Sequence, residues 1–359
     1  MKHFVLSLLI ICCFSTFAQE IQRRLILFGD AGEINEEQEG LLEDAANLVI
    51  SNKTSVFFLG DNIYPLGMGL TKDEAEHTGA ILRSQYGAFV QKGSPTYFIA
   101  GNHDWDKSGP QGLAKVKAQA AFLKNQGEAL VKFLPEPGTA ELATLPLTDK
   151  VIAVLYDSEY WLFPHHNHPD SALEGVVRET FLKVLRQLIQ QNSDKTILLI
   201  SHHPMQSYGE HAVKFSWRDH LFPLTRKWKS AYVPLPVLGS IYPLLRSTVL
   251  RSAEDLPHPH YKRLVRDVYE QVGDHQNVIF ISGHDHGLQY IEREGRKQIV
   301  SGSGAKTSFI SGGKGSKYRH NEQGFCTLDC LDDGSLNLSF YIYSNQQVKK
   351  AYEKSITVN

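Results

Sequence analysis

The sequence predicts an α/β protein in which short buried strands alternate with amphipathic helices. Brief apolar runs recur along the chain without the alternation of polar and apolar residues that a half-exposed strand shows. Such runs are typical of strands that are covered on both faces. Helical patterns separate several of the runs, and this succession indicates sheets with helices packed against them.

The composition is that of an ordinary globular protein, which excludes several classes. The 359 residues are 42% hydrophobic and 21% charged, with a formal net charge of −2. These values argue against disorder, collagen-like repeats and coiled coil. A near-neutral chain also lacks the basic surface of a general nucleic-acid binder. No internal repeat divides the chain, so we expect one domain over residues 19–359.

The first residues have the layout of a secretory signal peptide. Lys2 precedes an apolar run over residues 4–14, and the small residue Ala18 stands where cleavage is expected. The run is shorter than the roughly 20 residues of a transmembrane helix. We therefore expect residues 1–18 to be removed and the mature protein to be soluble and exported, either periplasmic or secreted.

Two cysteines, Cys326 and Cys330, remain after this cleavage. Four residues apart on an extended strand, they would share a face but lie about 13 Å apart, too far for a disulfide. We expect both to be small buried core residues.

The expected elements follow one another in chain order. Apolar runs predict strands and helical periodicity predicts helices. The strands are 25–28, 56–59, 97–100, 151–156, 197–200 and 278–281, and the helices are 37–51, 73–90, 113–134 and 173–191. Beyond the last strand the pattern becomes β-rich, with an Asp-Asp-Gly turn at 332–334. We expect this tail to form antiparallel strands that complete a second sheet.

Residues 212–275 have the character of an insertion, because they are rich in proline, aromatic and basic residues. Trp217, Trp228 and the apolar run 232–245 favour a lid, or a flap that contacts a membrane surface peripherally. The alternative is a segment that folds onto the core as a cover.

Polar motifs follow five of the apolar runs, where the expected strands end. They are GDAG (29–32), GDNIY (60–64), GNHD (101–104), SHHP (201–204) and GHDH (283–286). In open α/β folds, ligands bind at the carboxyl ends of strands. One such motif is commonly a turn, but five that all carry carboxylate, amide or imidazole groups indicate a site for two metal ions. The candidates are Asp30, Asp61, Tyr64, Asn102, His103, His202, His284 and His286.

The order of these motifs resembles that of the calcineurin-like metallophosphoesterase superfamily, over about residues 24–310. Within it the set resembles the purple acid phosphatases, most closely the tartrate-resistant (uteroferrin-like) branch. Most superfamily members have a metal-binding histidine where this chain has Gly32. Purple acid phosphatases instead use a tyrosinate three residues after the bridging aspartate, where this chain has Tyr64 after Asp61. HHPMQSYGEH (202–211), GHDHGLQYIE and SGSG are also similar to sequences of that branch.

The resemblance implies a fold and a metal centre. The fold is a four-layer α/β/β/α sandwich of two mixed β-sheets flanked by helices. The centre would hold Fe(III) at the first position and Fe(II), Zn or Mn at the second, with Asp61 bridging both. The other implied ligands are Asp30, Tyr64 and His286 for the first metal, and Asn102, His202 and His284 for the second.

The resemblance also implies which residues act on the substrate. His103 would hydrogen-bond the phosphate oxygens, and Glu210 and His211 would lie by the leaving group. His211 would help to protonate the departing alkoxide. His203 would only neighbour the ligand His202. The disulfide that vertebrate-type enzymes have near the active site is not expected, because no mature cysteine can supply it.

These expectations define an exported dinuclear acid phosphatase that hydrolyses small phosphate monoesters. Two cations can neutralise the phosphate dianion and lower the pKa of a bound water, and an imidazolium can protonate the leaving group. A trivalent ion with a phenolate ligand predicts an acidic pH optimum. The alternatives are a phosphodiesterase or nucleotide/sugar-phosphate hydrolase on the same core, an envelope-associated binding protein with secondary phosphatase activity, and a non-catalytic member. The oligomeric state is not predicted.

Most of the sixteen histidines are expected to lie on the surface. His165, His166 and His168 belong to the polar stretch FPHHNHPD, for which we expect a surface loop. The histidines expected to act in the site are those at 103, 202, 211, 284 and 286.

Overall fold

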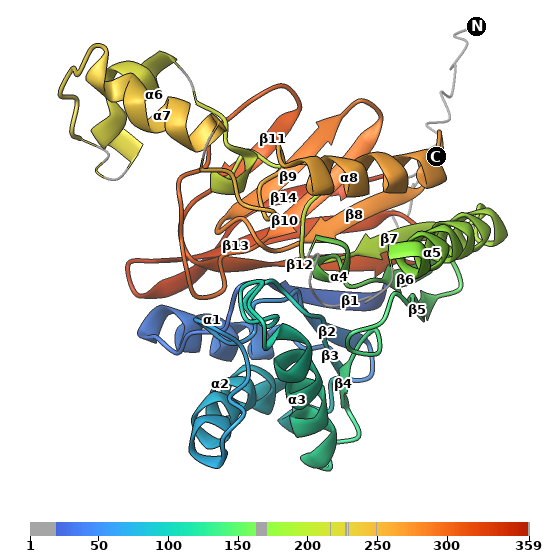
Figure 1. Ribbon diagram of the computed structural model, residues 1–359. Coiled ribbons are helices and arrows are strands. Elements are labelled where there is room, and N and C mark those ends of the chain that lie inside the picture. Colours follow the sequence, from blue (N-terminus) through green and yellow to red (C-terminus); the bar gives the residue numbers. More distant parts are fainter. Residues whose placement is uncertain are drawn as a thin grey trace, which may run out of the picture.

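The computed structural model describes residues 19–357, except 163–170 and the single positions 216, 227, 229 and 249. Two mixed seven-stranded sheets stack face to face, and helices cover the outer face of each (Figure 1). The predicted four-layer α/β/β/α sandwich is therefore confirmed. The expected signal peptide and the histidines at 165, 166 and 168 lie outside the described residues.

The first sheet has the strand order β14-β13-β12-β1-β2-β3-β4. Strands β1 to β4 run parallel to one another, whereas β12, β13 and β14 are each antiparallel to their neighbours. The bounds are β1 (Ile21–Phe28), β2 (Thr54–Phe58), β3 (Thr96–Phe98), β4 (Val131–Phe133), β12 (Gly324–Leu331), β13 (Leu336–Ser344) and β14 (Gln347–Ile356).

The second sheet has the order β11-β9-β10-β8-β7-β6-β5. Its central strands β6, β7, β8 and β10 are parallel, and β5, β9 and β11 pair antiparallel. The bounds are β5 (Ala143–Thr148), β6 (Val151–Leu155), β7 (Thr196–Ile200), β8 (Val278–Ser282), β9 (Leu288–Arg293), β10 (Arg296–Ser301) and β11 (Ser316–His320).

Helices form the two outer layers. Helices α1, α2 and α3 pack on the first sheet, and α5 and α8 pack on the second. Local sequence fixes some of the starts: α2 begins with a capping box formed by Thr71 and Glu74. The bounds are α1 (Glu36–Asn47), α2 (Lys72–Gln91), α3 (Gly112–Asn125), α4 (Glu159–Leu162), α5 (Ser171–Gln191) and α8 (Pro259–Val272).

Three apolar layers hold the sandwich together. The layer between the sheets includes Leu27, Phe57, Ile281 and Leu338. The outer layers lie under α1–α3 and under α5 and α8. Every residue of β2, β7 and β8 is buried, which explains why these strands show no polar alternation in the sequence.

Two sequence-based expectations about elements are wrong. The helix expected over 113–134 ends at Asn125, and Val131–Phe133 pairs with β3 as strand β4. Gly127, with φ +74°, turns the chain between them. The β-rich tail does not all join the second sheet, because β12 pairs with β1 and carries β13 and β14 with it. The tail also contains a parallel pairing, between β10 and β8.

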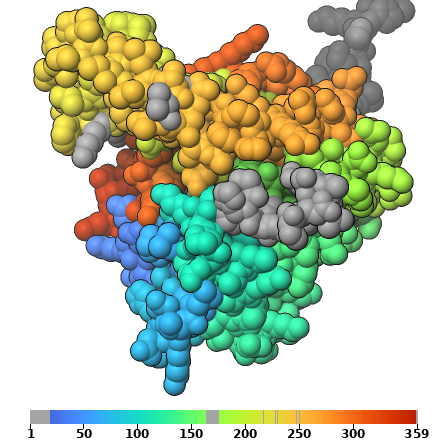
Figure 2. All heavy atoms as spheres, in the orientation of Figure 1, coloured from blue at the N-terminus to red at the C-terminus, as the bar shows by residue number. Residues whose placement is uncertain are grey.

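The stretch 212–275 divides into two parts. Its last element, α8, is a core helix, in which Tyr261 and Leu264 are fully or almost fully buried. Before it, α6 (Trp217–Leu221), the 3₁₀ turn η2 (Pro223–Arg226) and α7 (Leu238–Thr248) project from the sandwich (Figures 1 and 2). Among the described residues, no helix has the length and apolarity needed to cross a bilayer.

Cys326 and Cys330 are free and buried, as expected.

Candidate metal centre

The polar motifs meet where the parallel strands of both sheets end. Strands β1, β2 and β3 run in one direction side by side, as do β7 and β8, so the loops that follow them gather at one edge. Asp30, Asp61 and His284 in these loops all have left-handed backbone conformations, with φ of 59°, 54° and 71°. Non-glycine residues adopt this conformation rarely, and they concentrate at functional sites.

A first group of donor atoms surrounds the Tyr64 hydroxyl. The Tyr64 oxygen lies 3.1 Å from Asp30 Oδ1, 3.1 Å from Asp61 Oδ2 and 3.2 Å from His286 Nε2. The Asp30 and His286 donors are 3.4 Å apart. The structure therefore brings together Tyr64 and all the residues that the sequence predicted around the first metal.

A second group is centred on the amide oxygen of Asn102. Asn102 Oδ1 lies 3.0 Å from His202 Nε2 and 3.2 Å from His284 Nδ1. His202 Nε2 is also 3.5 Å from Asp61 Oδ1. Asp61 thus directs one carboxylate oxygen at the second group and the other at Tyr64 in the first.

Backbone carbonyls fix the orientation of two histidine rings in the second group. His202 Nδ1 lies 2.8 Å from the Leu59 carbonyl oxygen, and His284 Nε2 lies 2.9 Å from that of Glu254. A carbonyl only accepts, so these nitrogens carry the proton. The lone pairs on His202 Nε2 and His284 Nδ1 therefore face Asn102, as metal coordination requires.

Backbone amides and glycines hold the two carboxylates in place. His103 N donates to Asp61 Oδ1 at 2.9 Å, and His284 N donates to Asp30 Oδ2 at 2.7 Å. A Cβ at Gly101 would collide with the amide and carboxylate of Asp61, and one at Gly283 would lie 2.7 Å from Asp30 Oδ2. Glycine is needed at both positions because the loops approach each other so closely.

The buried donors fit bound cations. Burial would raise the pKa of Asp61, but nearby His202 and His103 lower it, so the carboxylate stays charged. Burial lowers the pKa of His284 well below its usual range, with further lowering from the adjacent histidines. Burial, followed by Asp30 and Asp61, raises the pKa of Tyr64. A cation among these donors would reverse that effect and favour the phenolate.

Two independent geometric groupings of ligand-type atoms coincide with this centre. Asp30, Asp61 and His286 form one, and His202, His203 and His284 form the other, each with its ligand atoms within 4.8 Å of one another. The arrangement supplies two adjacent candidate metal positions of carboxylate and imidazole chemistry.

His203 belongs to the second grouping by proximity, but its side chain engages another pair of residues. Its Nδ1 lies 2.9 Å from Ser158 Oγ, and its Nε2 lies 3.7 Å from Glu159 Oε2. Burial lowers the pKa of His203 and raises that of Glu159, so both side chains favour their neutral forms. Ser158 and Glu159 could not be predicted here, because both follow β6 in a segment without a recognisable motif.

The three residues expected to act on the substrate occupy different surroundings. His103 packs edge-on against the Tyr64 ring, with ring centres 4.5 Å apart, and its Nδ1 lies 2.5 Å from the Pro65 carbonyl oxygen. The His211 ring lies 4.1 Å from that of His284. Glu210 begins the short 3₁₀ turn η1 (Glu210–Ala212) and is exposed, so it stands beside the centre and not within it.

Sequence reasoning missed the partners of His211. Its Nδ1 lies 3.1 Å from Asp255 Oδ1. Arg246 from α7 donates hydrogen bonds to both oxygens of the same carboxylate. Burial would lower the pKa of His211, but Asp255, Asp285 and Glu254 outweigh it and raise the value to about 9. The Asp255 pKa is lowered, because Arg246 and His211 overcome the effect of burial.

Two further residues near the centre were not predicted. Asp104 accepts hydrogen bonds from Gly101 N at 2.8 Å and Asn62 N at 3.1 Å, and so joins the loops that follow β2 and β3. The ammonium of Lys306 lies 3.7 Å from the centre of the Tyr64 ring. Asp104 is visible in the sequence as the last residue of GNHD, whereas nothing in the sequence marks Lys306.

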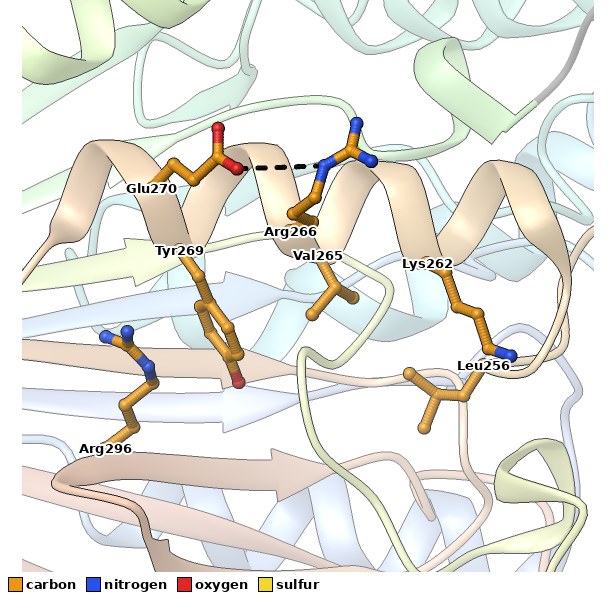
Figure 3. Close-up of a pocket in the computed structure, with 7 residues that line it drawn as sticks. All are labelled: Leu256, Lys262, Val265, Arg266, Tyr269, Glu270 and Arg296. Carbon is orange, nitrogen blue, oxygen red and sulfur yellow. Dashed lines mark ion pairs between the residues drawn. The ribbon is translucent and has the colours of Figure 1, made fainter.

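A cavity of about 890 Å³ adjoins the centre between the projecting segment and the chain around residue 308. Glu210 lines it, and Ser308, also in its wall, hydrogen-bonds the His286 carbonyl at 2.8 Å. Trp228, Tyr242, Phe309, Arg226 and Arg319 supply aromatic and cationic walls. A separate hollow of about 480 Å³ lies against α8, where Arg296 stacks on Tyr269 (Figure 3), and no predicted site residue lines it.

Comparisons with known proteins agree with this fold. The family model described as calcineurin-like phosphoesterase matches residues 23–229. Among solved structures, GAP50, the anchor in the inner membrane complex of Plasmodium, is 17% identical, with 95% of this chain and 90% of that chain covered and a TM-score of 0.56. The purple acid phosphatase PPD1 from yellow lupin (Lupinus luteus) seeds is 15% identical, with 93% of this chain and 53% of that chain covered and a TM-score of 0.51.

A third solved structure, that of PhoD, is 11% identical, with 94% of this chain and 73% of that chain covered and a TM-score of 0.53. Likenesses at these identities establish the fold alone. The search of curated proteins found no match.

Proposed function

The chain belongs to the calcineurin-like phosphoesterase family, and from that premise we propose that it is an exported acid phosphatase that hydrolyses phosphate monoesters. The position of Asp61 between two groups of buried donors carries the proposal. Its two oxygens face different groups, an arrangement that allows the carboxylate to bridge two cations. Tyr64 in the first group supports an assignment to the purple acid phosphatases, and within them to the tartrate-resistant branch.

The metal assignment follows from the donor sets. A phenol between carboxylates suits a hard trivalent ion, so we assign Fe(III) to Asp30, Tyr64 and His286. The imidazoles of His202 and His284 with the amide of Asn102 suit Fe(II), Zn or Mn. When bound, the two cations would neutralise the phosphate dianion and supply a water that ionises at low pH.

The surrounding residues then position the ester and move a proton. His103 lies next to Tyr64 at the open side of the first group, where it can hydrogen-bond phosphate oxygens. His211 donates its Nδ1 proton to Asp255, and its acidic neighbours raise its pKa to about 9. The ring is therefore an imidazolium at neutral pH and also carries a proton on Nε2 that can be donated. As the bond between phosphorus and the ester oxygen breaks, that oxygen takes the Nε2 proton, a transfer typically worth about 10²–10⁴-fold.

The adjoining cavity is where we place the leaving group. It begins at Glu210, next to His211, and its volume of about 890 Å³ suits a bulky organic group better than a small alcohol alone. Its aromatic and cationic walls favour substrates that combine an apolar or aromatic part with further negative charge.

Turnover of p-nitrophenyl phosphate compared with its bis-ester tests the monoester assignment. We expect the monoester to have the higher kcat/KM, with an optimum at acidic pH. A preference for the bis-ester would establish the phosphodiesterase alternative instead. Activity that rises steadily towards alkaline pH would overturn the acid phosphatase and iron assignments together.

A further inference from the structure

The segment 215–250, called the arm below, concentrates the exposed apolar side chains of the molecule. Of the sixteen large hydrophobic residues that are exposed among the described residues, eleven lie between Trp217 and Leu250. Figure 2 shows the arm projecting beyond the outline of the sandwich. A soluble monomer rarely exposes so many apolar side chains together unless the surface has a partner.

Several of these exposed apolar side chains lie on one face of helix α7. Leu238, Ile241 and Leu245 follow the spacing of one helix face, and their exposed fractions are 65%, 50% and 43%. Apolar residues at this spacing ordinarily face a protein core. Here these side chains face solvent. Helix α7 is therefore amphipathic, and no described residue buries its apolar face.

The arm is nevertheless fixed at its base. Arg226 pairs with Asp219 inside the arm at 2.9 Å and lies over the Phe309 ring of the body at 4.8 Å. Arg246 forms the ion pair with Asp255, and α6 and α7 pack on each other. The arm therefore presents its apolar surface from a defined position.

The positive charge of the arm favours an anionic partner. Residues 215–251 contain six basic residues and one acidic residue, whereas the whole chain has a net charge of −2. An apolar helix face with basic flanks and exposed tryptophan and tyrosine is suited to the boundary between headgroups and acyl chains. A second copy of the chain would bring two basic arms together, which their mutual repulsion disfavours.

We propose that the arm docks on an anionic lipid bilayer, with the exposed face of α7 entering the interfacial layer and Arg218 and Arg251 facing the lipid phosphates. The contact is peripheral, because no described helix could span the bilayer. The proposal does not depend on the reaction at the metal centre, since it rests on exposed side chains that touch no predicted ligand.

Sedimentation of the mature chain with phosphatidylcholine vesicles, with and without phosphatidylglycerol, tests this docking. We expect binding that needs phosphatidylglycerol and weakens with salt. Substituting Val237, Leu238 and Ile241 with serine should reduce binding by at least about tenfold, because three large side chains no longer enter the interface. Replacing Val176 and Val184, exposed on α5, with serine is the matched control and should leave binding unchanged.

Activity and thermal stability serve as controls for misfolding of the arm variant. Hydrolysis of p-nitrophenyl phosphate and the thermal midpoint should be the same in the arm variant and the wild type, which separates lost docking from misfolding. A second variant, R218E/R251E, should lose the dependence on phosphatidylglycerol while keeping the apolar face. Equal pelleting of all variants, or no binding of the wild type, would overturn the proposal. The proposal would also be overturned if the wild type were a dimer in solution and the serine variant a monomer, because the apolar face would then bind a second copy of the chain.

Discussion

The Nδ1 atom of His211 lies 3.1 Å from Asp255 Oδ1, and Arg246 from the projecting arm hydrogen-bonds both oxygens of the same carboxylate. This chain of contacts orients the His211 ring next to His284 and leaves Nε2 free of Asp255. It links the proposed leaving-group acid to residues that are distant from it in sequence.

Asp255→Asn should reduce the fraction of His211 that is protonated near neutral and alkaline pH. Burial lowers the pKa of His211 but the acidic neighbours raise it to about 9, so the imidazolium persists through neutral pH in the wild type. Removing the carboxylate charge should lower this pKa and move the alkaline fall of kcat/KM to lower pH. We expect kcat to fall about 10- to 100-fold.

The pH–rate profile of kcat/KM measures this effect. Asp267→Asn is the control, because Asp267 is also a buried carboxylate paired with an arginine, Arg178, but belongs to the packing of α5 on α8. An Asp255→Asn profile that keeps the wild-type alkaline limb would show that Asp255 does not act through His211.

Gly101→Ala should weaken metal binding without unfolding the protein. The new Cβ would collide with the amide and carboxylate of Asp61, so the bridging oxygens must move. We expect metal affinity to fall by about 10- to 100-fold, as when groups that orient a ligand are removed. Titration of the chelator-treated protein with Zn²⁺, followed calorimetrically, gives the value. Gly87→Ala in α2 is the control, since a Cβ there meets nothing within 4 Å.

Asp157 should make the stability of the fold depend on pH. It accepts a hydrogen bond from Trp105 Nε1 at 2.9 Å, and burial raises its pKa to about 6 despite that bond. Because the folded-state pKa lies above the unfolded value of 3.8, the unfolded chain ionises first. The free energy of unfolding contributed by this group therefore falls as pH rises from about 4 to about 6, by up to roughly 3 kcal/mol.

Asp157→Asn should remove this part of the pH dependence. Urea unfolding near pH 4 and near pH 7 gives the change in the free energy of unfolding for each protein, and that change should be smaller for the variant. Identical changes for the two proteins would mean that Asp157 ionises normally in the folded state.

Much of the centre could be predicted because its residues follow buried strands. Asp30 and Asp61 come directly after apolar runs, and parallel neighbours carry their ends to one edge. Tyr64 could be recognised only through its spacing from Asp61. The expected strands at 151–156, 197–200 and 278–281 agree with β6, β7 and β8 to within one residue, because five consecutive buried residues leave few other structures open to the chain.

The rest depends on contacts between distant segments. Asp255 reaches His211 across 44 residues, and Arg246 reaches Asp255 from a separate helix, so neither is marked by a local pattern. Strands β9, β10 and β11 of the tail join the second sheet as expected, but β12, β13 and β14 join the first. The sequence marks β12 as a strand without indicating that its partner is β1. The exposure of α7 could not be predicted either, because its apolar face has the spacing of a helix packed on a core.

Metal analysis of the purified protein, combined with its visible spectrum, tests the central claim most directly. The account predicts two metal ions per chain, at least one of them iron, and a charge-transfer band from Tyr64 that disappears in Tyr64→Phe. The Tyr64 hydroxyl oxygen lies within 3.2 Å of three other predicted ligand atoms, so this variant should also bind the first metal more weakly. A colourless, fully active protein with zinc or manganese alone would contradict the iron assignment, and full activity without bound metal would contradict the dinuclear centre itself.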